Sequence, residues 1–166
     1  MGQIRATALS GSTDEMFRSG FCKASRRLSK QIMLPSGLPD LVADGEDLAR
    51  FLTSSSQFNA KGAKPSAFLP APKSRETSVF RHGAEPSAEL WQIRAKYLGG
   101  SRINRGAAIV KSSDVRAVGL SVIAGEPPPR HAAIRDWPLD NDPELQKAKQ
   151  KERAALVARK ATLVRP

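Results

Sequence analysis

The sequence predicts an α+β fold, with a small, mainly antiparallel sheet of three to four short strands and about three helices packed on one face. Two stretches with apolar residues at helical spacing, 86–98 and 142–160, stand among several short stretches of strand character. The length of 166 residues fits one domain, and an apolar content of 40% allows a modest core. We therefore expect a single α+β domain at 41–166, preceded by an extension at 1–40.

The extension at 1–40 differs in composition from the rest of the chain. Its basic residues outnumber its acidic ones, and no apolar periodicity lasts long enough to build a buried face. Burial cannot then offset the entropy lost on ordering, and we expect the segment to be disordered or loosely attached. Two alternatives stay open: the domain proper starts near Met33, or the extension is a basic arm that binds nucleic acid.

The first part of the domain is predicted to hold one helix and two short strands. Asp44 can cap a helix through its side-chain oxygen. The apolar residues of that helix follow at spacings of three and four and are Leu48, Phe51 and Leu52. Strand character returns at 66–69 and 77–82, and the prolines between them prevent continuous pairing because proline lacks the ladder donor.

The middle of the domain is predicted to alternate between helix and strand. A helix starts at Pro86 and ends at Leu98, where two glycines follow. Residues 106–110 and 120–124 have the composition of buried strands, and a serine at 112 or 113 can cap a short helix between them. We expect this strand–helix–strand unit to hold the centre of the sheet.

The end of the chain is predicted to begin with an extended stretch, because three prolines occupy 127–129. An alternating segment follows at 131–137. Asp142, Pro143 and Glu144 then combine a capping side chain, a first-turn proline and an acid at the positive end of a helix dipole. A long helix to about residue 160 and a last short strand at 162–164 are expected.

Several classes of protein are excluded by what the sequence lacks. No apolar run approaches the roughly 18 residues that span a bilayer, and the N-terminus lacks the apolar stretch of a secretory signal. Cys22 is the only cysteine, which excludes an internal disulfide. Gly99 and Gly100 follow a predicted helix, whereas a phosphate-binding loop precedes one. We expect a cytoplasmic protein with no membrane partner and no cofactor.

Positive charge is the strongest bulk feature of the chain, with a formal net charge of +11. Such a surface attracts polyanions, most often nucleic acid, through its field and through counterion release. Charge that only solubilises the chain is the alternative. We predict a non-enzymatic accessory module that binds nucleic acid or a protein–nucleic-acid complex. The binding residues would be Arg81, Arg130, Arg135, Trp137, Lys147 and Lys151.

A small enzyme is the alternative function. The prolines stiffen the approach to Arg130 and His131, and a rigid Arg-His pair suits anion binding with proton transfer. His131 would be the acid/base of catalysis, and Arg81 with Arg130 would clamp a phosphate-containing substrate. Convergence of these three side chains in one pocket would favour the enzyme, whereas scatter over a convex basic face would favour binding. A protein-interaction or toxin–antitoxin partner is a third class.

The two histidines do not point to a metal or to a two-histidine phosphodiesterase. Ala84 and Ala133 occupy the positions, two residues after His82 and His131, where such an enzyme carries hydroxyl residues. Two histidines with scattered acids also lack the local spacing of a metal site. We therefore predict no metal site, and His131 can equally be a strand residue bonded to a backbone carbonyl.

Four short segments resemble a group of small uncharacterised bacterial proteins, often of mobile-element type. The segments are 64–68 (KPSAF), 78–81 (SVFR), 90–93 (LWQI) and 128–138 (PPRHAAIRDWP). The resemblance covers about 45–165, implies one shared domain and brings no known activity with it. Alanines replace a charged pair of the group near 106–109, which would impair this chain if the pair carries chemistry.

Overall fold

A computed structural model describes residues 32–83, 87–99 and 103–166 of the chain. Predictions that fall elsewhere lie outside the described residues. They include the basic arm before Met33, the lone Cys22 and the helix start at Pro86. In the described part of the chain, no helix is long and apolar enough to cross a membrane.

Six strands of the described residues form one sheet, in the order β6-β7-β4-β1-β5-β8, and every neighbouring pair is antiparallel. The strands are β1 (Asp47–Phe51), β4 (Thr77–His82), β5 (Ala107–Lys111), β6 (Ser121–Ala124), β7 (His131–Arg135) and β8 (Thr162–Val164). The short strands β2 (Phe58–Asn59) and β3 (Gly62–Ala63) pair as a separate hairpin. The α+β prediction is confirmed, but the sheet is wider than the three to four strands predicted.

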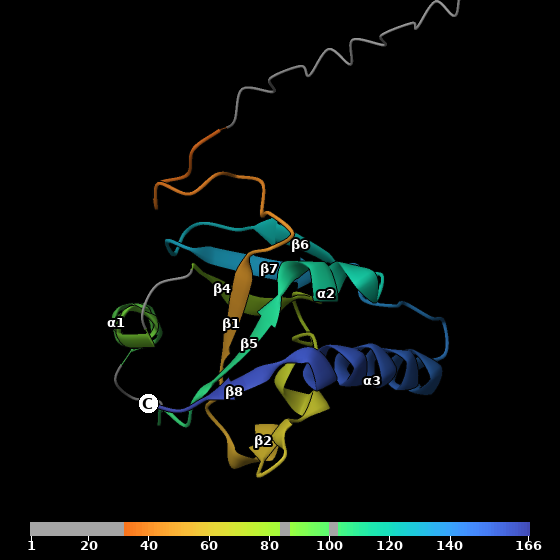
Figure 1. The fold of residues 1–166 in the computed structure, drawn as a ribbon. Coiled ribbons are helices and arrows are strands. Elements are labelled where there is room, and N and C mark those ends of the chain that lie inside the picture. Colours follow the sequence, from red (N-terminus) through yellow and green to blue (C-terminus); the bar gives the residue numbers. More distant parts are fainter. Residues whose placement is uncertain (1–31, 84–86, 100–102) are drawn as a thin grey trace, which may run out of the picture.

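The helices lie on both faces of the sheet (Figure 1). Helix α1 (Ser87–Leu98) packs on one face, where its Leu90 joins a cluster with Phe80 of β4. Helices α2 (Ser112–Ala117) and α3 (Pro143–Lys160) cover the other face. The prediction of helices on one face is therefore wrong for α1. The central strands are apolar on both sides, so both faces need cover.

Residues 47–51 form strand β1, and not the helix predicted from Asp44. Leu48 lies in the larger core cluster, whereas Ala49 lies in the smaller cluster on the opposite face. Because both faces of β1 are buried, its apolar residues do not alternate with polar ones, and their spacing of three and four also fits a helix. The Asp44 carboxylate binds the guanidinium of Arg116 and caps no helix.

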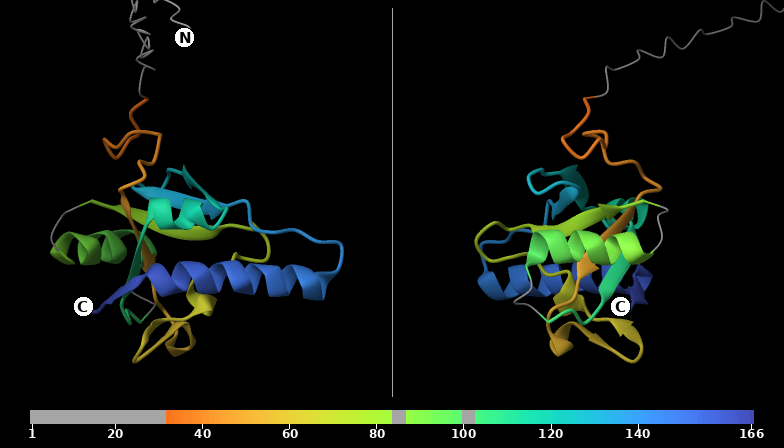
Figure 2. Two further views of the ribbon diagram at one scale, coloured as in Figure 1. Left: turned by 45° about the vertical axis from the view of Figure 1, so that its right-hand side comes forward. Right: turned by 90° about the vertical axis from the view of Figure 1, so that its left-hand side faces the viewer.

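The strand predicted at 66–69 is also wrong, because this stretch begins with a 3-10 turn, η2 (Pro65–Ala67). Pro65 favours the first turn of a helix, and Ala67 is fully buried. A second 3-10 turn, η1 (Ser55–Gln57), and the hairpin β2–β3 precede it and were not predicted. Figure 2 shows this hairpin beside α3.

The strand–helix–strand unit forms as β5, α2 and β6, but it does not hold the centre of the sheet. Strand β6 is one edge of the sheet, and β5 lies next to the other edge, so the centre belongs to β4 and β1. The remaining predicted elements form as β4, α1, β7, α3 and β8. The Asp142 side chain caps α3 by accepting from the N–H groups of Glu144 at 2.9 Å and Leu145 at 3.4 Å.

The prolines at 127–129 lie in a turn that joins β6 to β7, and not in an extended stretch. The His131 N–H donates to the Pro128 carbonyl at 3.0 Å, and the Gly125 N–H donates to the His131 carbonyl at 3.0 Å. A proline φ is compatible with turns as well as with extended chain. The turn places His131 at the first position of β7.

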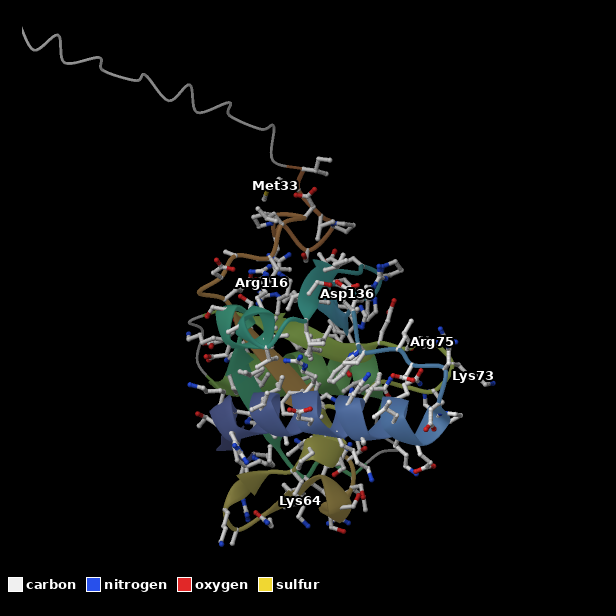
Figure 3. The ribbon with its side chains drawn as sticks, turned by 90° about the vertical axis from the view of Figure 1, so that its right-hand side faces the viewer. Met33, Lys64, Lys73, Arg75, Arg116 and Asp136 are labelled. Carbon is white, nitrogen blue, oxygen red and sulfur yellow. The ribbon has the colours of Figure 1, made fainter. Side chains whose placement is uncertain are left out.

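Residues 32–40 lie against this turn. Met33 forms a bridge with Pro39, and the Ser36 N–H donates to the Glu126 carboxylate at 3.1 Å. Figure 3 shows Met33 at the end of the molecule opposite to Lys64, which lies beside the β2–β3 hairpin. The segment 32–40 and the β2–β3 hairpin therefore lie at opposite ends of the molecule.

Candidate functional site

Arg81 is a buried structural residue. Its side chain is 1% exposed, and its Nε lies 2.6 Å from Glu46 Oε1, with Nη2 donating to Oε2 at 3.0 Å. The third guanidinium nitrogen donates to the Pro39 carbonyl. A guanidinium enclosed in this way has no donor directed to solvent, so the geometry gives Arg81 no place in an anion clamp.

Arg130 occupies the last position of the proline turn, with a positive φ of 65°. Its Nη2 lies 2.8 Å from Glu89 Oε1 on α1, so its charge is met by a carboxylate. The Arg130 N–H donates to Glu126 Oε1 at 2.7 Å, and its carbonyl accepts from the Arg81 N–H at 2.8 Å. Arg130 thus ties the turn to α1 and β4.

The Glu126 carboxylate joins the proline turn to the segment 32–40, because it accepts from the N–H groups of Ser36 and Arg130. Burial raises its pKa, but hydrogen bonds from Ser36 and from the Arg130 backbone, with the positive charge of Arg81, outweigh burial. The net result is a pKa below the ordinary value of 4.5. The carboxylate is therefore ionised near neutral pH, when it accepts from both backbone N–H groups.

His131 makes two hydrogen bonds that fix its ring. Its Nδ1 lies 2.8 Å from the Gly125 carbonyl, and its Nε2 lies 2.8 Å from the Ser78 hydroxyl oxygen on β4. A carbonyl can only accept, so Nδ1 carries the proton in the neutral ring and Nε2 accepts from the Ser78 hydroxyl. Both groups line a pocket of 270 Å³ at the side of β4.

The enzyme prediction required Arg81, Arg130 and His131 in one pocket, and they do not converge. Arg81 is buried against Glu46, Arg130 lines a separate cavity of 390 Å³ beside α1, and His131 lines the pocket with Ser78. The predicted clamp therefore does not form, and the three side chains do not share a convex basic face either, because Arg81 is buried.

Arg135 and Trp137 differ in accessibility. Trp137 is 4% exposed, belongs to the larger core cluster, and donates from Nε1 to the Ile134 carbonyl at 3.2 Å. It is therefore a core residue and cannot stack on a base. Arg135 is half-buried on β7, where its Nε lies 2.7 Å from Glu76 Oε1.

A basic groove lies between the β2–β3 hairpin and the C-terminal half of α3. Its volume is 440 Å³, and Lys61 and Arg159 are its charged lining residues. Small residues and one proline complete the lining: Gly62, Ala63, Pro65, Ala155, Ala158 and Ala161. No acidic residue of the described chain lines this groove, and the small residues leave room for a ligand backbone.

Lys147 and Lys151 lead along α3 toward this groove. Each step of four residues turns about 40° around a helix, so Lys147, Lys151, Ala155 and Arg159 form a slanted row on α3, and the last two line the groove. Both lysines are exposed, and Lys147 lies 3.7 Å from Glu144. At the far end, the Arg165 guanidinium lies 5.9 Å from the centre of the Phe58 ring.

Sequence reasoning missed Ser78, Lys61 and Arg159 as site residues. Ser78 had no signal in the sequence, because its contact with His131 depends on the register of β4 with β7. The signal for Arg159 was its spacing of eight residues from Lys151, which keeps it on the same side of α3. Lys61 had no signal, because the hairpin that carries it was not predicted.

In the described part of the chain, no three His, Cys, Asp or Glu side chains come together as a possible metal-ligand set. His82 is buried, and its Nδ1 has no hydrogen-bond partner among the described residues. Comparisons with known proteins add no identity: no family model, curated protein or solved structure matches the chain.

Proposed function

We propose that the protein is an accessory module that binds nucleic acid, or a protein–nucleic-acid complex, through the basic groove, and that this binding role needs no catalytic step. The observation that carries the proposal is the pairing of Lys61 and Arg159 across one groove with no lining carboxylate. Phosphates are bound by such cations through charge and counterion release. A backbone of small residues between the cations lets a phosphate chain approach closely.

The exposed lysines of α3 extend this surface. Lys151 makes no ion pair with the described residues, and it lies one helical turn before Ala155 of the groove. The carboxylates of Glu144 and Glu152 also lie on α3, but neither lines the groove. A nucleic-acid strand would therefore run along α3 and enter the groove beside the hairpin.

The net charge of +11 supports the proposal without specifying a sequence or a strand type. A cytoplasmic location and a kinship with bacterial mobile-element proteins are part of the same proposal, on the resemblance of the four segments. The phosphate-clamp enzyme is not carried forward, because carboxylates hold Arg81 and Arg130.

The test is binding of fluorescent single- and double-stranded DNA and RNA to the full chain at about 0.15 M salt. We expect the double variant Lys61→Gln/Arg159→Gln to bind about tenfold or more weakly. The matched control Lys73→Gln/Lys96→Gln removes the same charge from positions outside the groove and should change affinity less than about threefold.

Three outcomes count against the proposal. Absence of binding by the wild-type chain would exclude a nucleic-acid function of this surface. Equal weakening by both double variants would mean that binding follows net charge and not the groove. Unchanged affinity of both double variants would mean that nucleic acid binds outside the groove.

A further inference from the structure

We propose that Ser78 and His131 form a nucleophile–base pair that hydrolyses small carboxylic esters. The site is the pocket of 270 Å³ beside β4, and it shares no lining residue with the basic groove. The inference therefore does not rest on nucleic-acid binding. It also differs from the predicted clamp, because it uses Ser78 and needs neither Arg81 nor Arg130.

The first support is the geometry of the pair. Ser78 Oγ lies 2.8 Å from His131 Nε2, which is the separation that an activated hydroxyl nucleophile and its base require. The Gly125 carbonyl, 2.8 Å from Nδ1, takes the orienting role that a third group has in such sites. The neutral ring therefore presents its basic nitrogen to the hydroxyl.

The second support is that Gly125 is shaped to admit the ring. A Cβ on Gly125 would lie 3.1 Å from His131 Nδ1 and 3.6 Å from Cε1. A Cβ atom at the shorter of these distances would force the imidazole ring to shift. Gly125 is therefore a positioning residue for His131, both through its carbonyl and through its missing side chain.

The third support is access to Ser78. Its side chain is exposed, although β4 is one of the two central strands of the sheet. Its register partner on β7 is Ala133, which is small. On the other side, the recorded pairing of β1 with β4 ends at Ala49 and Phe80, before Ser78 is reached. A substrate can therefore approach the hydroxyl.

The pocket chemistry fits a short acyl group and a developing negative charge. Beside the pair, its lining residues are Arg50, Leu69, Ala71, Ser74 and Glu76. Leu69 and Ala71 give it an apolar wall, and its volume lies below the roughly 300 Å³ of the smallest drug-sized sites. Arg50 donates to the Ser78 carbonyl at 2.9 Å, which fixes positive charge beside the serine.

The reaction balances with an ester and water as the reactants. Ser78 Oγ bonds to the ester carbonyl carbon while its proton passes to His131 Nε2. As the carbon–oxygen bond breaks, that proton passes to the leaving alcohol, and the acyl group stays on Ser78. Water then attacks the acyl carbon, and its proton returns through Nε2 to Ser78 Oγ as the carboxylic acid leaves.

The test is reaction of the full chain with an alkyl fluorophosphonate, with the labelled residue located by peptide mass spectrometry. We expect labelling at Ser78, and turnover of p-nitrophenyl acetate above that of free imidazole. His131→Ala should slow labelling about 100-fold or more, because the general base is lost. Gly125→Ala should also slow it, through the displaced ring.

Two control variants make the test decisive. Ser113→Ala changes an exposed serine of α2 that does not line this pocket and should leave labelling at Ser78 unchanged. Ser78→Ala, at an exposed position, should abolish labelling while leaving the melting temperature and nucleic-acid affinity unchanged. Failure of the folded wild-type chain to react, or equal labelling of Ser74 and Ser78, would overturn the proposal whatever the groove binds.

Discussion

The two faces of the central sheet differ in how fully they are covered. On one face, α2, α3 and η2 enclose the larger cluster, from Val42 to Ala158. On the other, α1 covers a cluster of six buried residues around Phe80. Beyond α1 on that face, strands β4 and β7 present Ser78, His131 and the half-buried Arg135. Polar side chains therefore lie on the part of the sheet that no helix covers.

The more fully covered face should contribute more to stability, whereas the less covered face can carry reactive polar groups. Apolar burial contributes to stability in proportion to the area removed from water, so the larger cluster should contribute more than the smaller one. The thinly covered face is free to hold polar side chains near solvent. The basic groove belongs to neither face, because it lies on the outer side of α3 against the hairpin.

The largest expected effect compares two buried leucines on opposite faces. Leu48 is 0% exposed in the larger cluster, and Leu90 is 1% exposed under α1. Leu48→Ala should cost about 4 kcal/mol and Leu90→Ala about 2 kcal/mol, because α1 can close over the void more easily than the sheet can. Urea unfolding of both variants measures this, and equal costs would contradict the comparison.

The next effect concerns the buried charge of Arg81. Glu46→Gln leaves that guanidinium without its carboxylate, and we expect a loss of about 3 kcal/mol. The matched control is Asp47→Asn, which breaks a pair with Lys111 whose side chains are 27% and 50% exposed. That variant should cost less than about 1 kcal/mol in the same unfolding measurement. A similar loss in both would show that Arg81 is not sequestered.

A smaller effect is the pH dependence contributed by Glu126. Its pKa in the folded chain is lowered, so its contribution to stability is present above its ordinary value of 4.5 and is lost as the pH falls through the folded pKa. The difference in unfolding free energy between wild type and Glu126→Gln should therefore shrink on acidification below about pH 4.5. A free-energy difference that grows on acidification would mean that the pKa of Glu126 is raised in the folded chain and not lowered.

The elements predicted correctly from the sequence are those with clear signals at their ends. Strand β4 begins after a proline-rich stretch, and α3 has a capping side chain, a first-turn proline and basic residues in its last turn. Strand β1 was missed because both of its faces are buried, which removes the alternation. The hairpin β2–β3 was missed because strands of two residues carry no period.

The candidate sites depend on contacts that no local pattern encodes. His131 was identified from its proline-rich approach, but its partner Ser78 is 53 positions away and is set by the register of β4 with β7. The partner of Arg81, Glu46, is 35 positions away, so no local pattern indicates that the guanidinium is enclosed. Register and pairing are tertiary outcomes, and they decide which charged residues are accessible.

The proposal that the basic groove binds phosphates can be tested by measuring how nucleic-acid affinity depends on salt concentration. The slope of log affinity against log salt should be measured for a single-stranded oligonucleotide with the full chain and with the variant Lys61→Gln/Lys151→Gln/Arg159→Gln. Three lost phosphate contacts should reduce the slope by about 2. An unchanged slope in the variant would contradict the claim, because the three cations would then contact no phosphate.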